Sequence, residues 1–574
     1  MDFQKKRMDR RQFLKGAGAV TVGVTAAGVL GGSVFASDDE VDAASSATSV
    51  AGSEVQAGGG TASIDGITRY TTYVNVDKIG VLQEASSTEE ADVVVVGTGI
   101  GGMMCAMILA EQRPEGKYVL LEKNDYLGGS TLYAECNTPS AGSTKAAAYK
   151  SGATQAASSS FIKDPILIAE TAIDRGKNSA WLFTKHNIGW SGMFYEGGNG
   201  RIPIQKLQAE IEAGGVYSAI DLRTSTRASA LLVSEDGYEV TGVQVLNPDG
   251  SYTNITAKAV VLATGGLSTN FKLLSYYTGQ DVEQKCHGWG AGQDGDGHLL
   301  VEQTAHGMCK GITVSSLFNN VRGFEYDSPL GVCATMQPKN LYVNQYGDRF
   351  VSEAISDTAA SGKLVELAGK VFSIMGQNLI DDFEAGGCTR KYSAFSDALA
   401  GTPCDIRSEF EKYKDNENVY VADTIEELAE LIGTPDLVET VAQYEQDCAA
   451  GSGDSVFGKA ASSMVSLGAG PYYALQLSSG VLNTNGGIRV DRNSMVCDPY
   501  FTPVKGLFAA GVCCSGWDGE IYGGGTCQPV SMWGGSKSAR YILENYLSCP
   551  PADDWFGPEE YGAGSSGGAS GGAS

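Results

Sequence analysis

The stretch Ala91-Asp92-Val93-Val94-Val95-Val96 leads directly into Gly97-Thr98-Gly99-Ile100-Gly101-Gly102, and this junction decides the fold. The four successive valines predict a short buried strand. Residues 103–112 are mostly apolar or helix-forming and predict a helix. A strand, a glycine-rich turn and a helix in this order are typical of an α/β sheet that binds a dinucleotide. A purely structural turn is the weaker interpretation.

The turn contains a Gly-x-Gly-x-x-Gly triplet made of Gly97, Gly99 and Gly102. The first glycine permits the tight turn, the second lets the backbone approach a pyrophosphate, and the third lets the helix pack closely on the strand. Ile100 and Gly101 complete the turn, and the N-terminus of the helix that follows would face the phosphate charge. We therefore expect these five residues to bind the pyrophosphate.

A second strand is expected at 117–121, followed by Glu122 and Lys123. Glu122 lies 20 residues beyond the last glycine of the triplet. A carboxylate at this spacing is typical of a residue that binds a ribose diol. The ordered series of strand, triplet, helix, strand and acid is far more specific than the triplet alone.

Segments further along the chain resemble the fumarate reductase flavoprotein family. Gly128-Gly129-Ser130-Thr131 resembles its second dinucleotide fingerprint, and 259–266 resembles its strand ending in Ala-Thr-Gly-Gly. Segments 486–490 and 506–511 resemble its Gly-Gly-Ile strand and its later glycine turn. The resemblance implies FAD, bound non-covalently. The residues that it places at the cofactor are Lys123, Gly128, Gly129, Ser130, Thr131, Ala263, Thr264, Gly265, Asp296, Gly511, Gly525 and Thr526.

The N-terminus resembles a twin-arginine export signal. Arg10 and Arg11 precede a weakly apolar run at 16–30, and Val34-Phe35-Ala36 offers a small-residue cleavage site. No other stretch is long and apolar enough to span a bilayer, so we expect no transmembrane span after cleavage. The protein is therefore expected outside the cytoplasmic membrane, in the periplasm, at the cell surface or in the medium.

The resemblance covers about residues 90–545 and implies an α/β fold. This fold is a Rossmann-like FAD domain of the two-dinucleotide-binding type with an inserted α+β capping domain, and substrate would lie between cap and flavin. Both ends of the chain are rich in Gly, Ser and Ala. We expect a signal peptide at 1–36, a flexible spacer and lead-in at 37–89, the FAD domain at 90–320 and 478–548, the cap at 321–477, and a disordered tail at 549–574.

Charge and cysteine content exclude several classes of function. The net charge of the 574-residue chain is −26, and removal of 1–36, with six basic and two acidic residues, leaves about −30. Such a polyanion repels nucleic acid, so no nucleic-acid partner is expected. The thirteen cysteines include no Cys-x-x-Cys pair, so we expect no iron–sulfur cluster; one built from scattered residues such as Cys513, Cys514 and Cys527 stays open as an alternative.

The residues by which fumarate reductases clamp two carboxylates and deliver a proton are replaced here. By local spacing, the proton-donating Arg, its relay Glu and Arg, the two His and the carboxylate-binding Arg fall respectively on Asp357, Cys333, Met336, Gly290, Asn483 and Tyr522. Each change removes a cationic or proton-carrying group, and bidentate Arg–carboxylate pairs are strong in a dry site. We therefore expect a substrate without two carboxylates, which excludes fumarate.

Tyr522 precedes Gly523-Gly524-Gly525 and resembles the tyrosine–glycine element of flavin ketosteroid dehydrogenases. The resemblance implies a hydroxyl that stabilises charge developing on the substrate carbonyl oxygen. A second acid must protonate the α-carbon. The candidates are Tyr342, Tyr346 and Tyr326 in the cap, and Asp357 if burial raises its pKa. A packing role is the alternative for each tyrosine.

We expect an exported FAD-dependent oxidoreductase that acts on CH–CH groups. It would reduce an activated C=C bond in a steroid-like or aromatic enone by hydride transfer from flavin N5. Three alternatives stay open: the reverse dehydrogenation, a flavin oxidase that uses oxygen, and a flavin-binding protein without catalysis. The sequence carries no evident NAD(P)H fingerprint and no haem motif, so a cytochrome or a quinone-linked protein is expected as the external electron donor.

Overall fold

The computed structural model describes most of the chain between residues 79 and 551. The described residues are 63–64, 67–68, 79–134, 142–160, 162–191, 194–196, 199–282, 286–288, 292–304, 306–325, 328–335, 337–355, 358–389, 400–523 and 525–551. The predicted signal peptide and most of the predicted spacer and tail lie outside them. So do four residues singled out in the sequence, Gly290, Tyr326, Met336 and Asp357.

A six-stranded sheet forms the centre of the nucleotide-binding part. Its strands, in spatial order, are β19 (Met495–Cys497), β20 (Pro503–Ala509), β12 (Ala259–Leu262), β4 (Val93–Val96), β5 (Tyr118–Leu121) and β8 (Ile220–Arg223). The five strands from β20 to β8 are parallel, and β19 is antiparallel to β20. All four valines of β4 are buried, as the sequence predicts for a strand of a parallel sheet covered on both faces.

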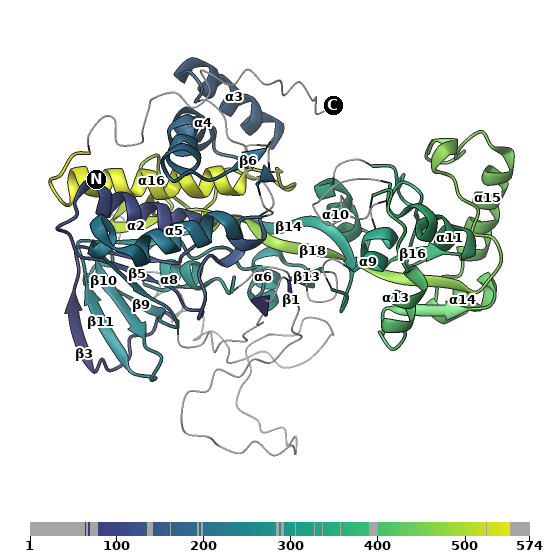
Figure 1. Ribbon diagram of the computed structural model, residues 1–574, viewed down its shortest axis with the longest axis horizontal. Helices are drawn as coiled ribbons and strands as arrows, with labels where there is room; N and C mark the ends of the chain where they lie inside the picture. The colour runs from purple at the N-terminus through teal and green to yellow at the C-terminus, as the bar shows by residue number, and fades with distance from the viewer. Residues whose placement is uncertain are drawn as a thin grey trace, which may run out of the picture. The chain divides into compact units, whose positions relative to one another are not determined.

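Helix α2 (Ile100–Gln112) follows β4 and packs along α16 (Cys527–Asn545), the long C-terminal helix in Figure 1. Glycines allow this close approach. A Cβ atom on Gly101 would lie 2.7 Å from the Ser531 carbonyl oxygen, and one on Gly535 would lie 2.1 Å from the Gly101 carbonyl oxygen. The expected helix at 103–112 is thus confirmed and begins three residues earlier, at the glycine turn itself.

Further helices and a second sheet complete this part of the molecule. The sheet has the order β3 (Ser87–Glu90), β11 (Tyr252–Thr256), β10 (Val240–Leu246) and β9 (Arg227–Val233). Strands β9, β10 and β11 form an antiparallel meander, and β3 joins it in parallel. The helices are α3 (Lys145–Ser158), α4 (Pro165–Ser179), α5 (Arg201–Ala213), α6 (Phe271–Thr278) and α8 (Asp296–Thr304).

A third sheet is built on β18 (Tyr472–Ile488), a strand of 17 residues. Residues 472–477 pair with β16 (Val371–Met375) and β17 (Val419–Ala422), whereas 477–488 pair with β14 (Cys309–Val321). Strands β13 (Cys286–Gly288) and β15 (Leu341–Asn344) extend the sheet on either side. The predicted domain boundaries at 320/321 and 477/478 therefore fall inside continuous strands, and they stay predictions.

The helices of the predicted cap surround β15, β16 and the first part of β18 (Figure 1). They are α9 (Pro329–Ala334), α10 (Thr358–Leu367), α11 (Gln377–Gly386), α13 (Ile406–Lys412), α14 (Ile425–Ile432) and α15 (Leu437–Ala450). The sequence marks their starts clearly. Thr424 and Glu427, for example, form a reciprocal capping box at the start of α14.

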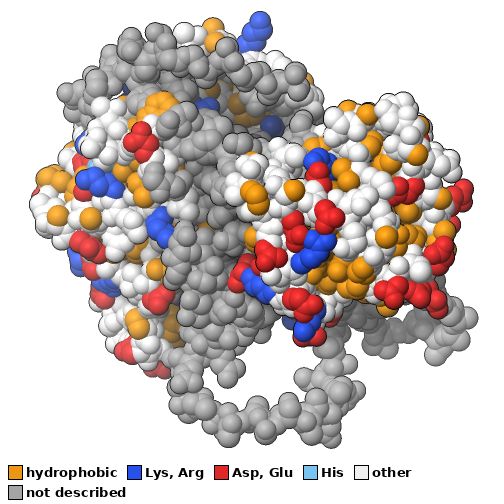
Figure 2. All heavy atoms as spheres, turned by 45° about the vertical axis from the view of Figure 1, so that its right-hand side comes forward, with side chains coloured by type: hydrophobic (Ala, Val, Ile, Leu, Met, Phe, Trp, Pro, Cys, Tyr) orange, Lys and Arg blue, Asp and Glu red, His pale blue; other side chains and the backbone are white. Residues whose placement is uncertain are grey.

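The surface reflects the acidic composition of the chain. Acidic residues number 67 against 41 basic ones. On the face shown in Figure 2, acidic side chains gather towards the right-hand edge and are interspersed elsewhere with basic and hydrophobic ones.

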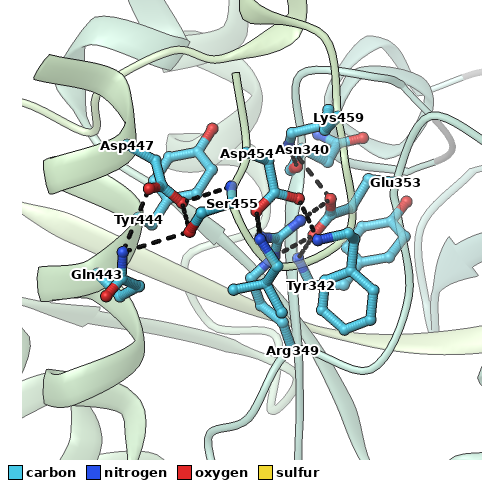
Figure 3. Close-up of polar contacts among 12 residues, drawn as sticks. Asn340, Tyr342, Arg349, Glu353, Gln443, Tyr444, Asp447, Asp454, Ser455 and Lys459 are labelled. Carbon is cyan, nitrogen blue, oxygen red and sulfur yellow. Dashed lines mark hydrogen bonds and ion pairs between the residues drawn. The ribbon is translucent and has the colours of Figure 1, made fainter. Parts of the chain in front are cut away.

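A buried ion network lies inside the cap (Figure 3). Arg349 pairs with Glu353 at 2.8 Å and with Asp454 at 2.8 Å, and Lys459 Nζ lies 3.2 Å from Glu353. Lys459 also donates to the carbonyl oxygen of Asn340. Burial alone would raise the pKa of Asp454, but Arg349 holds that pKa at about 2. The two cations and two carboxylates neutralise each other.

Candidate flavin site

The predicted cofactor residues gather at one edge of the central sheet. Strand β4 lies between β5, which follows it in sequence, and β12, which comes much later. The order of the strands reverses at this point, so the loops after β4, β5 and β12 diverge from a common crevice. Open α/β sheets bind dinucleotides in such a crevice, at the carboxyl ends of the strands.

The glycine triplet has the geometry expected of a phosphate turn. Gly97 has a φ of +105°, and a Cβ there would lie 2.3 Å from the Ala263 carbonyl oxygen. A Cβ on Gly102 would lie 1.9 Å from the Gly97 carbonyl oxygen. A Cβ on Gly99 would make only ordinary contacts, 3.5 Å from Thr131 Oγ1 and 3.9 Å from the Gly128 carbonyl oxygen. Packing within the chain therefore requires Gly97 and Gly102 but leaves open space at Gly99 for a ligand.

The N-terminus of α2 is available to an anion. Its N-cap residue is Gly99, which has no side chain to cap the first turn, and that turn contains no acidic residue. The amide of Ile100 is held by Thr131 Oγ1 at 3.2 Å. The uncapped amides and the helix dipole fit the pyrophosphate of FAD.

Thr98 joins the loops of this crevice, and the sequence analysis missed it. Its hydroxyl donates to Glu122 Oε2 at 2.6 Å and accepts from the backbone N–H of Gly128 at 3.0 Å. The backbone N–H of Asn124 donates to the other oxygen of Glu122. Burial raises the pKa of Glu122. A short hydroxyl residue between two glycines of the triplet was the signal that could have identified Thr98.

The second fingerprint forms a tight turn beside α2. Gly128 and Gly129 both have positive φ, +105° and +47°. Ser130 hydrogen-bonds to Gln293, whose side-chain amide also donates to the Leu482 carbonyl oxygen at 3.0 Å. These contacts tie the fingerprint to β18.

The loop after β12 lies against both the triplet and α8. The backbone N–H of Ala263 donates to the Val96 carbonyl oxygen at 2.7 Å, and Gly265 has a φ of +71°. A Cβ on Gly297 would lie 2.2 Å from Thr264 Oγ1. The loop with the three residues predicted here therefore packs against the strand and turn of the triplet, and their contact with the cofactor stays a prediction.

Lys123 and Asp296 belong to a buried charge cluster. Lys123 Nζ lies 2.7 Å from Asp294 and 3.2 Å from Asp296, and Arg227 binds both oxygens of Asp296. Burial alone would lower the pKa of Lys123, but the two carboxylates raise it. Burial would raise the pKa of Asp296, but Arg227 and Lys123 hold it far below its usual value. The side chains of Lys123 and Asp296 thus bind partners within the chain and hold together the loops beside the crevice.

The predicted residues of the C-terminal part lie around the start of α16. Gly511 has a φ of +86°, and its Cβ would lie 2.9 Å from Ser531 Oγ. Thr526 is the N-cap of α16 and donates its hydroxyl to the Gly523 carbonyl oxygen at 2.6 Å, while Gly525 has a φ of +75°. Asn483 on β18 donates its amide to Cys527 Sγ at 3.0 Å.

The loop 516–523, which carries Tyr522, is held from several sides. The Asp164 backbone N–H donates to the Gly516 carbonyl oxygen at 2.7 Å, and the Asn485 side chain donates to the Gly519 carbonyl oxygen at 3.1 Å. The Trp517 indole donates to Thr171 Oγ1. Tyr522 itself is half-buried. This anchoring presents Tyr522 shortly before the predicted cofactor residues Gly525 and Thr526, at the start of α16.

Asp518, in the same loop, is a second residue that the sequence analysis missed. Its Oδ1 is buried and has no hydrogen-bond partner among the described residues. Burial raises the pKa of Asp518 to about 6, against the opposing effect of Lys163. An acid placed between two glycines, shortly before the Tyr-Gly-Gly-Gly element, was the signal available in the sequence.

The other candidates for proton donor have different environments. Tyr342 is 2% exposed and packs among hydrophobic residues of the cap, and its backbone N–H donates to Glu353. Tyr346 is an exposed residue. Asp357 and Tyr326 lie outside the described residues. The structure thus gives Tyr342 a packing position, whereas Tyr522 lies in the loop that leads into Gly525 and Thr526.

Comparison with known proteins identifies the family. The FAD binding domain family matches residues 92–161 and 172–527. The chain belongs to this family. A twin-arginine translocation signal matches residues 7–31, so this FAD-dependent oxidoreductase is exported by the twin-arginine route. Within the described part of the chain, no helix combines the length and apolar character needed to cross a membrane.

Similar proteins support the resemblance on which the fold prediction rests. Vinyl phenol reductase of Lactiplantibacillus plantarum is 27% identical over 491 residues, covering 79% of this chain and 96% of that protein. A probable fumarate reductase of Shewanella frigidimarina is 25% identical over 503 residues, covering 82% and 78%. The structure of 3-ketosteroid-Δ4-(5α)-dehydrogenase from Rhodococcus jostii superposes with a TM-score of 0.56 at 20% identity, covering 80% and 97% of the two chains. The last similarity shows the fold, which confirms the predicted α/β class.

The cysteines do not assemble into a metal centre in the part of the chain that the structure describes. No group of three or more His, Cys, Asp or Glu side chains there is arranged to hold a metal ion. Cys513 and Cys514 are buried, with their sulfur atoms 3.7 Å apart. Cys527 accepts a hydrogen bond from the Asn483 side chain.

Proposed function

We propose that this exported FAD enzyme acts on CH–CH groups and reduces an activated C=C bond in an acceptor without two carboxylates, best fitted by an aromatic or enone substrate. Vinyl phenol reductase, whose name specifies a neutral aromatic acceptor, is the relative that supports the aromatic choice. Reduced FAD supplies a hydride to one carbon of the bond. The chain must supply the polar contacts and the proton.

The observation that carries this proposal is the charge of the residues beside α16. The positions that bind carboxylates in fumarate reductases hold Asn483 and Tyr522, and Asn483 is engaged with Cys527. The buried cations described near this region already have carboxylate partners, as in the pair Lys363–Glu366 and the cluster around Lys123. A dianion would find little compensating charge here, whereas a neutral substrate loses less on desolvation.

The hydroxyl of Tyr522 suits a substrate whose double bond is conjugated to an oxygen. In an enone, hydride addition moves negative charge onto the carbonyl oxygen. In a para-hydroxystyrene, protonation of the terminal vinyl carbon with loss of the phenol proton gives a quinone methide, and hydride addition to that species returns negative charge to the phenol oxygen. A neutral O–H donor placed at that oxygen stabilises the developing charge.

Electrons for the flavin must come from outside the chain. We propose an external redox protein, such as a cytochrome or a quinone-linked donor, and an acidic enzyme of this net charge favours a cationic one. The small-molecule acceptor would then reoxidise the flavin.

An anaerobic panel of acceptors tests the proposal. The photoreduced holoenzyme is mixed with fumarate, urocanate, cinnamate, 4-vinylphenol and a steroid enone, and flavin reoxidation is followed by absorbance. We expect fast reoxidation by a neutral conjugated acceptor and slow reoxidation by fumarate. Fast reoxidation by fumarate contradicts the proposal. So does the absence of fast reoxidation by any compound of the panel. Reduction of the oxidised enzyme by a saturated ketone would instead indicate the reverse reaction, and rapid peroxide formation in air would indicate an oxidase.

A further inference from the structure

A buried lysine lies where the cap meets the loop that carries Tyr522. Lys363 is on α10, which packs on β14, and is 8% exposed. Its Nζ lies 2.9 Å from Glu366 Oε1 and 3.6 Å from Glu520 Oε2. Glu520 stands two residues before Tyr522. The ammonium group therefore bridges a cap helix and the substrate-side loop.

Glu366 is the carboxylate that accepts a hydrogen bond from the Lys363 ammonium group, and its own position is fixed. It is fully buried, and its second oxygen accepts from Ser316 Oγ on β14 at 2.6 Å. A buried carboxylate requires a cation or several hydrogen bonds to remain in place. Glu366 thus holds the Lys363 ammonium at a defined position.

Glu520 connects the buried ammonium to water. Its side chain is 57% exposed, whereas those of Lys363 and Glu366 are almost fully covered. From solvent inwards, the groups are therefore the exposed carboxylate of Glu520, the buried ammonium of Lys363 and the buried carboxylate of Glu366. Lys459 lacks such a connection, because its described ionic partner Glu353 is itself fully buried.

We propose that Lys363 donates the proton that completes reduction of the substrate, with Glu520 as its relay to water. The inference rests on the proposed function. The π bond of the substrate breaks as a hydride from reduced FAD forms a C–H bond at one carbon. The electron pair of the π bond passes to the other carbon, and this carbon takes a proton as one N–H bond of Lys363 breaks. The neutral amine then regains a proton from water through Glu520.

The position of the cationic proton donor is Asp357 by local spacing, with Cys333 and Met336 at its relay positions, so no cation stands there. An ammonium group can act as a general acid when it is positioned at the reacting carbon. Lys363 lies six residues after Asp357 along the chain, which places a cation in the cap without restoring a bidentate carboxylate clamp.

The test compares two oxidants of the reduced enzyme. We expect Lys363→Met to lower the rate of reoxidation by the best C=C acceptor at least about 100-fold. Reoxidation by ferricyanide should stay within about twofold, because ferricyanide takes electrons and requires no C–H bond. The matched control is Lys339→Met, which removes another cap lysine paired with a carboxylate, Asp382, and should leave both rates unchanged.

Two further variants separate proton transfer from folding. Lys363→Met combined with Glu366→Gln leaves no unpaired buried charge, and should show the same selective loss. Lys363→Ala should recover part of the C=C rate when ethylammonium is added, and Glu520→Gln should give an intermediate rate with an enlarged solvent isotope effect. Equal rates of wild type and Lys363→Met with the C=C acceptor, or equal losses with both oxidants in every variant, overturn the inference while the proposed function stands. If wild type reduces no acceptor, the proposed function fails and this inference fails with it.

Discussion

At the scale of single residues, the chemistry of the proposed site depends on a few side chains of loop 516–523. Tyr522 offers a neutral hydroxyl, and Asp518 offers a carboxyl whose Oδ1 is buried without a described partner. Carboxyl groups with shifted pKa values are frequent in functional sites, because catalysis requires pKa values that suit the reaction. The two residues can be tested separately, since one affects turnover and the other affects how stability depends on pH.

Replacement of Tyr522 by Phe should remove one hydrogen-bond donor to the substrate oxygen and little else. We expect turnover to fall at least about 100-fold, in line with loss of a single oxyanion donor. The flavin spectrum should be unchanged. The measurement is steady-state reduction of the best acceptor, with Tyr500→Phe, an exposed tyrosine, as the control. Near-normal turnover of Tyr522→Phe would remove this residue from the mechanism.

Replacement of Asp518 by Asn should alter the pH dependence of stability. Burial raises the pKa of Asp518 to about 6. The folded protein therefore binds a proton that the unfolded chain has lost, and stability falls as pH rises from about 4 to about 6. The amide is neutral throughout, so Asp518→Asn should be more stable than wild type at pH 8, by at most about 3 kcal/mol, and similar to it at pH 4. Denaturant unfolding of the holoprotein at both pH values measures this, and parallel profiles would contradict it.

At the scale of elements, the strand–turn–helix unit of β4 and α2 combines two kinds of glycine. Gly102 is required by packing, because its Cβ would meet the Gly97 carbonyl oxygen at 1.9 Å. Gly99 is not, because its Cβ would make ordinary contact. This difference turns a sequence motif into two separable requirements, one for folding and one for the cofactor.

Alanine at Gly102 should therefore lower the stability of the protein, whereas alanine at Gly99 should weaken the binding of FAD. We expect Gly102→Ala to lower the stability of the apoprotein by about 1–3 kcal/mol through overpacking. Gly99→Ala should change apoprotein stability by less than about 0.5 kcal/mol, and weaken FAD binding at least about tenfold, because the methyl group occupies the space of the pyrophosphate. Thermal unfolding of apoprotein and FAD titration measure the two effects. Unchanged FAD affinity in Gly99→Ala would show that the pyrophosphate lies elsewhere.

Removal of one partner from the ion network of the cap should cost as much stability as it does in a buried ion pair, which is more than in a surface pair. Arg349→Met leaves Glu353 and Asp454 short of a cation in a buried position, and we expect a loss of about 3–5 kcal/mol. Arg407 pairs with Asp381 in an exposed position, so Arg407→Met should cost less than about 1 kcal/mol. Denaturant unfolding of both variants makes the comparison. Equal losses would mean that water reaches the network.

At the scale of the whole molecule, the sequence predicted the nucleotide-binding part better than the cap. The Val93–Val96 strand, the glycine turn and Glu122 follow one another within about 30 residues, so local pattern suffices there. Gln293 could not be assigned in the same way, because its partners Ser130 and Leu482 lie 163 and 189 residues away in the chain. The same holds for Lys363 and Glu520, which are 157 residues apart in the chain. The pair of Lys363 and Glu520 becomes visible only in the folded structure, where α10 packs on β14 and Asn485 of β18 binds the loop that carries Glu520.

The net charge of the molecule bears on how electrons reach the flavin. The chain carries −26 in total, and about −30 after loss of the signal segment. A cationic redox partner would be steered towards such a surface, and its association rate should fall steeply as salt screens the charge. We expect reduction by a small basic cytochrome to slow at least about tenfold between 10 and about 300 mM salt, while reduction by the small reductant dithionite changes far less. Stopped-flow reduction of the flavin measures both rates. A rate with the basic cytochrome that does not depend on salt would indicate a donor that docks through apolar contacts instead, because only charge-driven encounter responds to ionic strength in this way.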